Sequence, residues 1–136
     1  MAKGVFGFDN MSSSDAQNMH PQVLAFIGDG VYSMYIRQKI VLQENVKGSD
    51  LHNEVTNFVK AAGQSNFIEK LLPIFTDIEM SVFKRARNHK TLSQSKNASI
   101  IDYRRATGLE AVLGYLYLIG DMDRLNEILK LCVGEK

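Results

Sequence analysis

The chain has 136 residues, 45% of them apolar, which is enough for one globular domain with a buried core and excludes a disordered chain. Its formal net charge of +1 gives no overall attraction to nucleic acid. The single cysteine, Cys132, cannot form an internal disulfide, and residues 1–11 lack the apolar stretch of a secretory signal. The longest apolar run near the C-terminus, residues 111–119, is shorter than a membrane span, which needs about 20 residues. We therefore expect a soluble, cytoplasmic protein with no membrane partner.

The first residues differ in pattern from the rest of the chain. Residues 1–14 mix Gly, Ser and Asn with isolated Phe and follow no period, so we expect a flexible N-terminal arm. In residues 15–136 apolar residues recur at three- and four-residue spacing, and no strand pattern of comparable length is present. We therefore expect one all-α domain after the arm.

Start and stop signals divide this domain into helices. The first is expected from about residue 15 or 21, with Pro21 in its first turn, to about residue 42. Ser49 can cap a second helix that ends near residue 63, and Pro73 ends a third. Thr76 and Glu79 have the Thr-x-x-Glu form of a capping box. The later predicted elements are a fourth helix to residue 88, a polar loop over residues 89–97, a fifth helix over residues 99–118 and a last helix through residue 131.

Positive charge is concentrated between residues 84 and 105, where only Asp102 opposes it. Such a local basic segment favours contact with nucleic-acid phosphates even when the net charge is small. The alternative is a solvated basic face. The cations of this segment are Lys84, Arg85, Arg87, Lys90, Lys96, Arg104 and Arg105.

Two acidic residues, Asp29 and Glu110, interrupt helices that are otherwise apolar. Glycines lie close to both, although glycine costs roughly 1 kcal/mol inside a helix, which suggests that two backbones pack closely there. Such packing would bring the carboxylates together, and paired carboxylates with water suit Mg²⁺. Carboxylates on solvated helix edges, paired with Lys or Arg, are an equally compatible interpretation. The glycines are Gly28, Gly30, Gly108 and Gly114.

Several motifs in the same order resemble Mini-ribonuclease III, a compact branch of the ribonuclease III family. The resemblance runs from about residue 21 to the C-terminus. Its first motif looks like the signature helix of ribonuclease III domains, in which a Gly-Asp pair follows apolar residues. The motifs are Val23-Leu24-Ala25-Phe26-Ile27-Gly28-Asp29-Gly30-Val31-Tyr32, Leu51-His52, Lys84-Arg85-Ala86-Arg87-Asn88, Tyr103-Arg104 and Ala106-Thr107-Gly108-Leu109-Glu110-Ala111-Val112-Leu113-Gly114-Tyr115-Leu116.

The resemblance implies a ribonuclease III-like helical endonuclease domain that hydrolyses double-stranded RNA. Asp29 and Glu110 match the catalytic residues, which bind Mg²⁺, for which Mn²⁺ can substitute, and the metal activates water for attack on a phosphodiester. The products would carry a 5′-phosphate and a 3′-hydroxyl. The candidate RNA-binding residues are Lys84, Arg85, Arg87, Asn88, Lys90, Lys96 and Arg104. Of Arg104 and Arg105, one can face RNA while the other pairs with Asp102 or Glu110, and His52 is left out of the catalytic set.

The sequence departs from full-length ribonuclease III at three acidic positions. Gln22 and Ala25 replace glutamates of the signature helix, and Thr107 replaces an aspartate. We therefore predict one metal ion, held by Asp29 and Glu110, in place of a larger number.

The family also implies a homodimer in which each subunit cuts one strand. Phe26, Tyr32 and Tyr35 could supply its surface, although a helical stripe of aromatics is equally compatible with the core.

No double-stranded-RNA-binding module follows the last predicted helix, so the dimer or a helper must hold the substrate. By resemblance, the substrate is a large-subunit (23S) ribosomal RNA precursor and the helper a large-subunit ribosomal protein. One alternative is a non-catalytic RNA-binding or ribosome-assembly factor. A helical metal-binding or protein-interaction domain ranks last, because Glu-x-x-His pairs are lacking.

Overall fold

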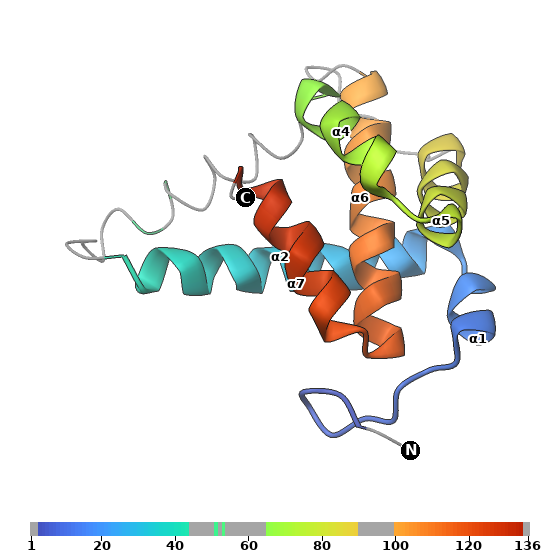
Figure 1. Cartoon of the computed structure of the whole chain (residues 1–136), viewed down its shortest axis with the longest axis horizontal. Coiled ribbons are helices and arrows are strands. Elements are labelled where there is room, and N and C mark those ends of the chain that lie inside the picture. The colour runs from blue at the N-terminus through green and yellow to red at the C-terminus, as the bar shows by residue number, and fades with distance from the viewer. Residues whose placement is uncertain (1–2, 44–50, 52, 54–64, 90–99, 135–136) are drawn as a thin grey trace.

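The computed structural model describes residues 3–43, 51, 53, 65–89 and 100–134, and its helices pack around one central helix, α6 (Ile100–Ile119) (Figure 1). The second half of α6 is apolar on every side, and the residues from Gly108 to Leu116 are almost all buried. A helix that is apolar all round must be covered all round. The helices that cover it are α2 (Pro21–Val41), α4 (Ser65–Leu71), α5 (Asp77–Asn88) and α7 (Met122–Cys132). The expected all-α fold is confirmed.

Helix α2 is the longest helix described and crosses α6 (Figure 1). It begins at Pro21, and the Nδ1 atom of His20 accepts a hydrogen bond from the Gln22 amide at 3.1 Å, which caps the helix. Its end at Val41 lies one residue from the predicted end. The helix that we predicted from Ser49 to about residue 63 falls mostly on residues outside the described ranges.

The capping box predicted from Thr76 and Glu79 is present at the start of α5. The Glu79 amide donates to Thr76 Oγ1 at 3.2 Å, and the Thr76 amide donates to Glu79 Oε1 at 2.9 Å. Before α5, helix α4 ends at Leu71, close to the end predicted from Pro73. A short 3-10 helix, η2 (Leu72–Ile74), follows it. These caps fix where α5 starts and therefore where its basic end lies.

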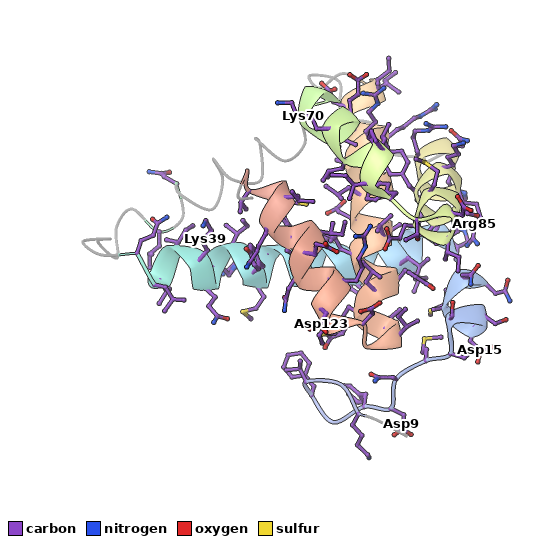
Figure 2. The ribbon with its side chains drawn as sticks, viewed as in Figure 1. Asp9, Asp15, Lys39, Lys70, Arg85 and Asp123 are labelled. Atoms are coloured by element: carbon purple, nitrogen blue, oxygen red, sulfur yellow. The ribbon has the colours of Figure 1, made fainter. Side chains whose placement is uncertain are left out.

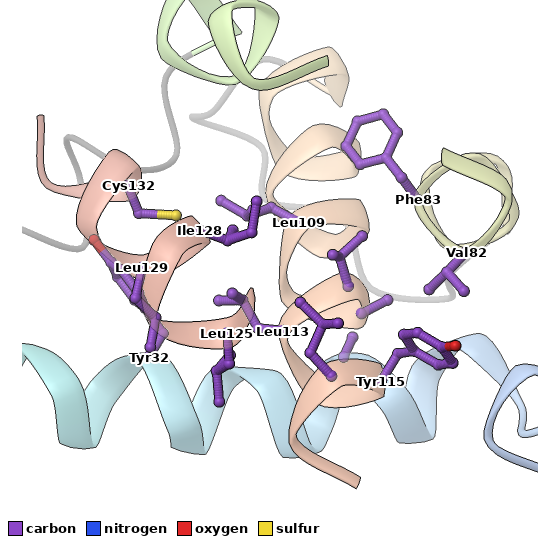
Figure 3. Close-up of a cluster of buried hydrophobic side chains, with 14 of the residues drawn as sticks. Tyr32, Val82, Phe83, Leu109, Leu113, Tyr115, Leu125, Ile128, Leu129 and Cys132 are labelled. Carbon is purple, nitrogen blue, oxygen red and sulfur yellow. The ribbon is translucent and has the colours of Figure 1, made fainter. Parts of the chain in front are cut away.

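Helix α7 begins after Gly120, which ends α6 with a left-handed φ of 77°. Asp121 caps α7 by accepting from the Arg124 amide at 3.2 Å. The apolar face of α7 packs on α6 and α2, where Leu125, Ile128 and Leu129 are buried (Figure 3). This cluster is the main core of the domain.

We did not expect the helix α1 (Ser13–Gln17) from the sequence, and it begins inside the predicted arm. Ser12 caps it by accepting from the Asp15 amide at 3.1 Å, and Ala16 is fully buried. Just before it, the Met11 amide donates to the Leu118 carbonyl of α6 at 2.8 Å. Residues 11–17 are thus part of the packed domain.

The part of the chain that the structure describes contains no β-strand, only an isolated bridge between Lys3 and Asp9. Among the same residues, no helix has the length and apolar character needed to cross a membrane.

Candidate active site

The two candidate carboxylates lie where α2 and α6 cross with their backbones in direct contact. A Cβ atom added at Gly28 would lie 1.6 Å from the carbonyl oxygen of Glu110, and one added at Gly114 would lie 2.0 Å from that of Leu24. Only glycine permits such an approach. The close packing predicted from the glycines is therefore confirmed at Gly28 and Gly114.

The other two glycines near the carboxylates have different surroundings. A Cβ at Gly108 would lie 2.7 Å from the Phe83 ring of α5, so Gly108 serves the contact between α5 and α6. A Cβ at Gly30 would meet no atom within 4 Å. The prediction that Gly30 serves a contact between α2 and α6 was wrong.

Asp29 and Glu110 face each other across the crossing, and a hydrogen bond joins their carboxyl groups. Burial of Glu110, followed by this hydrogen bond and the charge of Asp29, raises the pKa of Glu110 to about 9. Asp29 itself is exposed. Without a metal, Glu110 therefore keeps its proton at neutral pH.

The alternative interpretation, in which each carboxylate is paired with Lys or Arg, does not fit the described residues. None of the cations among them forms an ion pair with Asp29 or Glu110. Two facing carboxylates with no cation are a site that a divalent metal can complete, and Mg²⁺ binds through one or two carboxylates while keeping several waters. The donor set fits the metal that the sequence predicted.

Within the described ranges, no group of three or more acidic, His or Cys side chains could hold a metal. This agrees with the three departures from full-length ribonuclease III. Gln22 is exposed, Ala25 is buried, and the Thr107 hydroxyl donates to the Tyr103 carbonyl of its own helix at 3.0 Å. These side chains add no charge to the two carboxylates.

The aromatics proposed for a dimer surface divide into two kinds. Phe26 is 77% exposed, whereas Tyr32 is buried and points toward Cys132 of α7 (Figure 3). Burial raises the pKa of the Tyr32 phenol above its usual range, and nearby Cys132, Tyr35 and Glu110 add to the effect. Tyr35 packs partly buried against the core. The assignment of Tyr32 to an outer surface was wrong, because its row on α2 faces α7.

The basic end of α5 borders an open groove of about 640 Å³. Lys84 and Asn88 are exposed along it, and His89 closes one end. The groove is lined by Asp77, Met80, Ser81, Lys84, Arg85, Asn88 and His89. We call it the α5 groove.

The arginines of this segment make specific contacts within the chain. The Arg85 guanidinium donates to the backbone carbonyls of Gln17 and Met19, which ties α5 to the end of α1 (Figure 2). Arg87 lies 5.6 Å from the centre of the Phe83 ring and donates to Asn88 Oδ1 at 3.1 Å. The sequence could not reveal the Arg85 contacts, because their partners are more than 60 residues away in the chain, and we did not predict the local contacts of Arg87.

On α6, Arg105 forms an ion pair with Glu69 of α4 at 3.2 Å, a partner that we did not predict, and Arg104 is half-buried. Lys90, Lys96 and His52 lie outside the described residues.

Comparison with known proteins places this geometry in a family. The sequence model described as the Ribonuclease III domain matches residues 22–121, which include both carboxylates. The Mini-ribonuclease 3 of Clostridium tetani is 44% identical over 92% of this chain and 83% of its own length. That of a Thermoanaerobacter species is 41% identical over 98% of this chain and 96% of its own. A crystal structure of a protein from Fusobacterium nucleatum superimposes with a TM-score of 0.75 and 28% identity, covering 88% of this chain and 96% of that one.

The fold and the matched domain define a ribonuclease of the ribonuclease III type. Within that class, the chain belongs to the Mini-ribonuclease 3 family, because its relatives of that name match most of its length at 34–44% identity.

Proposed function

We propose that the chain is an endoribonuclease that cleaves double-stranded RNA by Mg²⁺-assisted hydrolysis, with Asp29 and Glu110 as the metal ligands and Mn²⁺ as a possible substitute. The observation that carries the proposal is the facing pair of carboxyls at the α2–α6 crossing, where the pKa of Glu110 rises to about 9 in the absence of a cation. A family of ribonucleases provides the reaction class.

The protein's own contribution is to hold the two carboxylates in place. The backbone contact at Gly28 fixes how far α2 stands from Glu110. Asp29 is exposed, so a phosphate of a bound duplex can reach it, while Glu110 is shielded and must release its proton to act as a ligand. Mg²⁺, when bound there, supplies a Lewis acid that activates water and stabilises charge on the phosphate.

The α5 groove is the proposed RNA surface, with Lys84 and Asn88 as its exposed contacts. Arg85 and Arg87 are held by other groups, so we expect them to position the groove more than to grip RNA. Phosphate contacts of this kind give salt-dependent binding that recognises the shape of the duplex. Lys84→Glu should weaken duplex binding and flatten its salt dependence, as measured by fluorescence anisotropy. Unchanged affinity would contradict the α5 groove as the RNA surface and favour the other candidates, Arg104 and residues 90–96.

A second copy of the chain is the proposed partner of an exposed apolar face on α2. We call this the α2 face, and its members at three- and four-residue spacing are Val23, Phe26, Gly30 and Met34. Phe26 is 77% and Met34 60% exposed. A Cβ added at Gly30 would meet no described atom within 4 Å, although a helical glycine costs about 1 kcal/mol, and the approach of another backbone would explain the glycine. We infer a homodimer that joins through this face.

Two matched substitutions test the dimer. Phe26 and Phe8 are each 77% exposed, but only Phe26 belongs to the α2 face. Phe26→Ser should lower the molecular mass in solution toward one chain, whereas Phe8→Ser should leave it unchanged. Equal masses for wild type and both variants would contradict the α2 face as the interface.

We extend the proposal to structured ribosomal RNA precursor as the natural substrate, at the ends of 23S ribosomal RNA, with a large-subunit ribosomal protein as helper. This extension rests on the family resemblance, since the described residues contain no feature that selects one RNA. Cleavage assays with precursor and with an unrelated duplex, each with and without ribosomal protein, would separate the two substrates.

The central experiment incubates the purified protein with duplex RNA and Mg²⁺. Wild type should cleave it, and Asp29→Asn and Glu110→Gln should each lose cleavage by at least a hundredfold, roughly the effect of removing a group that stabilises transition-state charge. Both variants should still bind RNA. A wild type that binds the duplex and leaves it intact would favour the non-catalytic RNA-binding alternative.

A further inference from the structure

A row of polar side chains extends along α2 from the carboxylate pair. Asp29, Ser33 and Arg37 follow one another at intervals of four residues, so each lies about 40° further round the helix than the last. The neighbouring row is buried in the core and holds α2 against the domain. That row consists of Leu24, Gly28, Tyr32, Ile36 and Ile40.

A hydrogen bond turns Arg37 back toward the carboxylates. Its Nε donates to Ser33 Oγ at 3.2 Å. Helical side chains lean toward the N-terminus, so this bond places the guanidinium over the turn that separates Arg37 from Asp29. The Cα atoms of these two residues lie about 12 Å apart along the helix axis, and the lean shortens the gap for the side chains.

Arg37 has no acidic partner within the described part of the chain. Arg105 pairs with Glu69, and Arg124 pairs with Glu79 and Glu127, whereas Arg37 is exposed and makes no ion pair with a described residue. With Nε on Ser33, the two terminal nitrogens of this exposed side chain have no hydrogen bond to a described residue. A planar guanidinium with two free nitrogens suits a phosphate group.

The α5 groove, with Lys84 exposed along it, lies near the opposite end of α2. His20, which caps α2, contacts His89 at the end of α5 with ring centroids 4.7 Å apart, so the α5 groove borders the start of α2. Asp29 lies nine residues after His20, about 13 Å along the axis. Along the axis of α2, the carboxylate pair therefore lies between the start of the helix, which the α5 groove borders, and Arg37.

We propose that Arg37, oriented by Ser33, binds a backbone phosphate of the RNA on the side of Asp29 away from the α5 groove. This inference rests on the proposed function, since it takes the RNA to cross the carboxylate pair. Contacts at both ends of α2 would keep one strand lying over Asp29 and Glu110. Arg37 is thus an RNA-binding residue outside the basic segment of residues 84–105.

Binding measurements without metal test this contact, because the RNA then stays whole. Fluorescence anisotropy with a short RNA duplex in EDTA, over a series of salt concentrations, compares wild type with Arg37→Ala, Arg37→Lys, Ser33→Ala and the control Lys130→Ala. Arg37→Ala should bind roughly tenfold more weakly, and its salt slope should fall by about one. Arg37→Lys should keep the slope and lose part of the affinity, and Ser33→Ala should behave similarly. Lys130→Ala removes the same charge from α7 and should match wild type.

The same variants in a cleavage assay with Mg²⁺ separate this inference from the proposed function. Arg37→Ala should raise KM more than it lowers kcat. If wild type does not cleave duplex RNA, the proposed function fails whatever Arg37 binds. If wild type cleaves and Arg37→Ala matches it in affinity and salt slope, only the Arg37 inference is overturned. Arg37 also lies on the same side of α2 as the α2 face, three residues after Met34, so a changed molecular mass of Arg37→Ala would assign it to the interface between copies and overturn its role in RNA binding.

Discussion

Two glutamates, Glu79 and Glu110, are shielded from solvent in the same small domain, and their surroundings shift their pKa values in opposite directions. Burial alone would raise the pKa of Glu79, but hydrogen bonds from Arg124 and Thr76 and the Arg124 charge lower it. Arg124 reaches both carboxylate oxygens, at 2.8 and 2.7 Å, and also donates to the Ile74 carbonyl. Glu110 has only Asp29 opposite it, and its pKa rises to about 9.

The comparison separates a carboxylate neutralised within the fold from the one that we propose as a metal ligand. Glu79 has a cation from its own chain and joins α5 to α7, so its charge is already neutralised. Glu110 lacks one among the described residues, and the close backbone contact at Gly28 places it beside α2. A shielded carboxylate without a cation costs stability unless a ligand supplies the charge.

The largest expected effect comes from the contact that holds Glu110. Gly28→Ala places a methyl group 1.6 Å from the Glu110 carbonyl oxygen, a backbone atom that cannot turn away. We expect a loss of about 3 kcal/mol or more in the free energy of unfolding, measured by urea denaturation. Gly30→Ala, two residues further along α2, meets no described atom of its own chain and should cost much less than Gly28→Ala, because a gain of up to about 1 kcal/mol in helix propensity opposes any loss of the proposed contact with a second copy. Equal stabilities would contradict the backbone contact.

The next effect concerns the paired glutamate. Arg124→Met leaves the Glu79 carboxylate buried without its cation and should cost about 3 kcal/mol in the free energy of unfolding. The matched control is Arg105→Met, which breaks the more exposed pair with Glu69 and should cost less than about 1 kcal/mol. Cleavage per folded molecule should stay near the wild-type value in Arg124→Met. A selective loss of cleavage would mean that Glu79 also serves the active site.

A smaller effect, with a defined pH dependence, is expected at Glu110. Its folded pKa of about 9 exceeds its value of about 4.5 in the unfolded chain, so the folded state holds the extra proton between these values. Without metal, wild-type stability should therefore fall as pH rises from about 5 toward 9. Glu110→Gln keeps a donor toward Asp29 and removes the charge, so it should be more stable than wild type at pH 8 by on the order of 1–2 kcal/mol. Thermal unfolding in EDTA at pH 6 and pH 8 measures the difference, and a wild type whose stability rises over this range would refute the assignment.

Local signals in the sequence predicted most helices. The Thr-x-x-Glu pattern places the start of α5, Pro21 starts α2, and Gly120-Asp121 separates α6 from α7. The glycines beside Asp29 and Glu110 indicated a close backbone contact, which is present at Gly28 and Gly114 and absent at Gly30, but they left the pairing of the carboxylates open until the family resemblance favoured it. These are cases in which a few neighbouring residues determine the local structure.

The missed features depend on residues that are far apart in the chain. Phe26 and Tyr32 both lie on α2, whose apolar residues occupy nearly every side, so the sequence alone could not tell which of them faces α7. The sequence indicates only that Arg85 is a surface cation, because its hydrogen-bond partner at the end of α1 is far away in the chain. Helix α1 has only five residues, too few for a periodic pattern, and its burial depends on α6.

The contact between Gly28 and Glu110 has a consequence for motion. In most helix pairs, side chains separate the two backbones and can change rotamer to absorb small displacements. Here the Glu110 carbonyl lies directly against Gly28, and no rotamer exists to take up a shift. We therefore expect α2 and α6 to move together at this point, so that fluctuations elsewhere in the core displace the backbones of Asp29 and Glu110 in common.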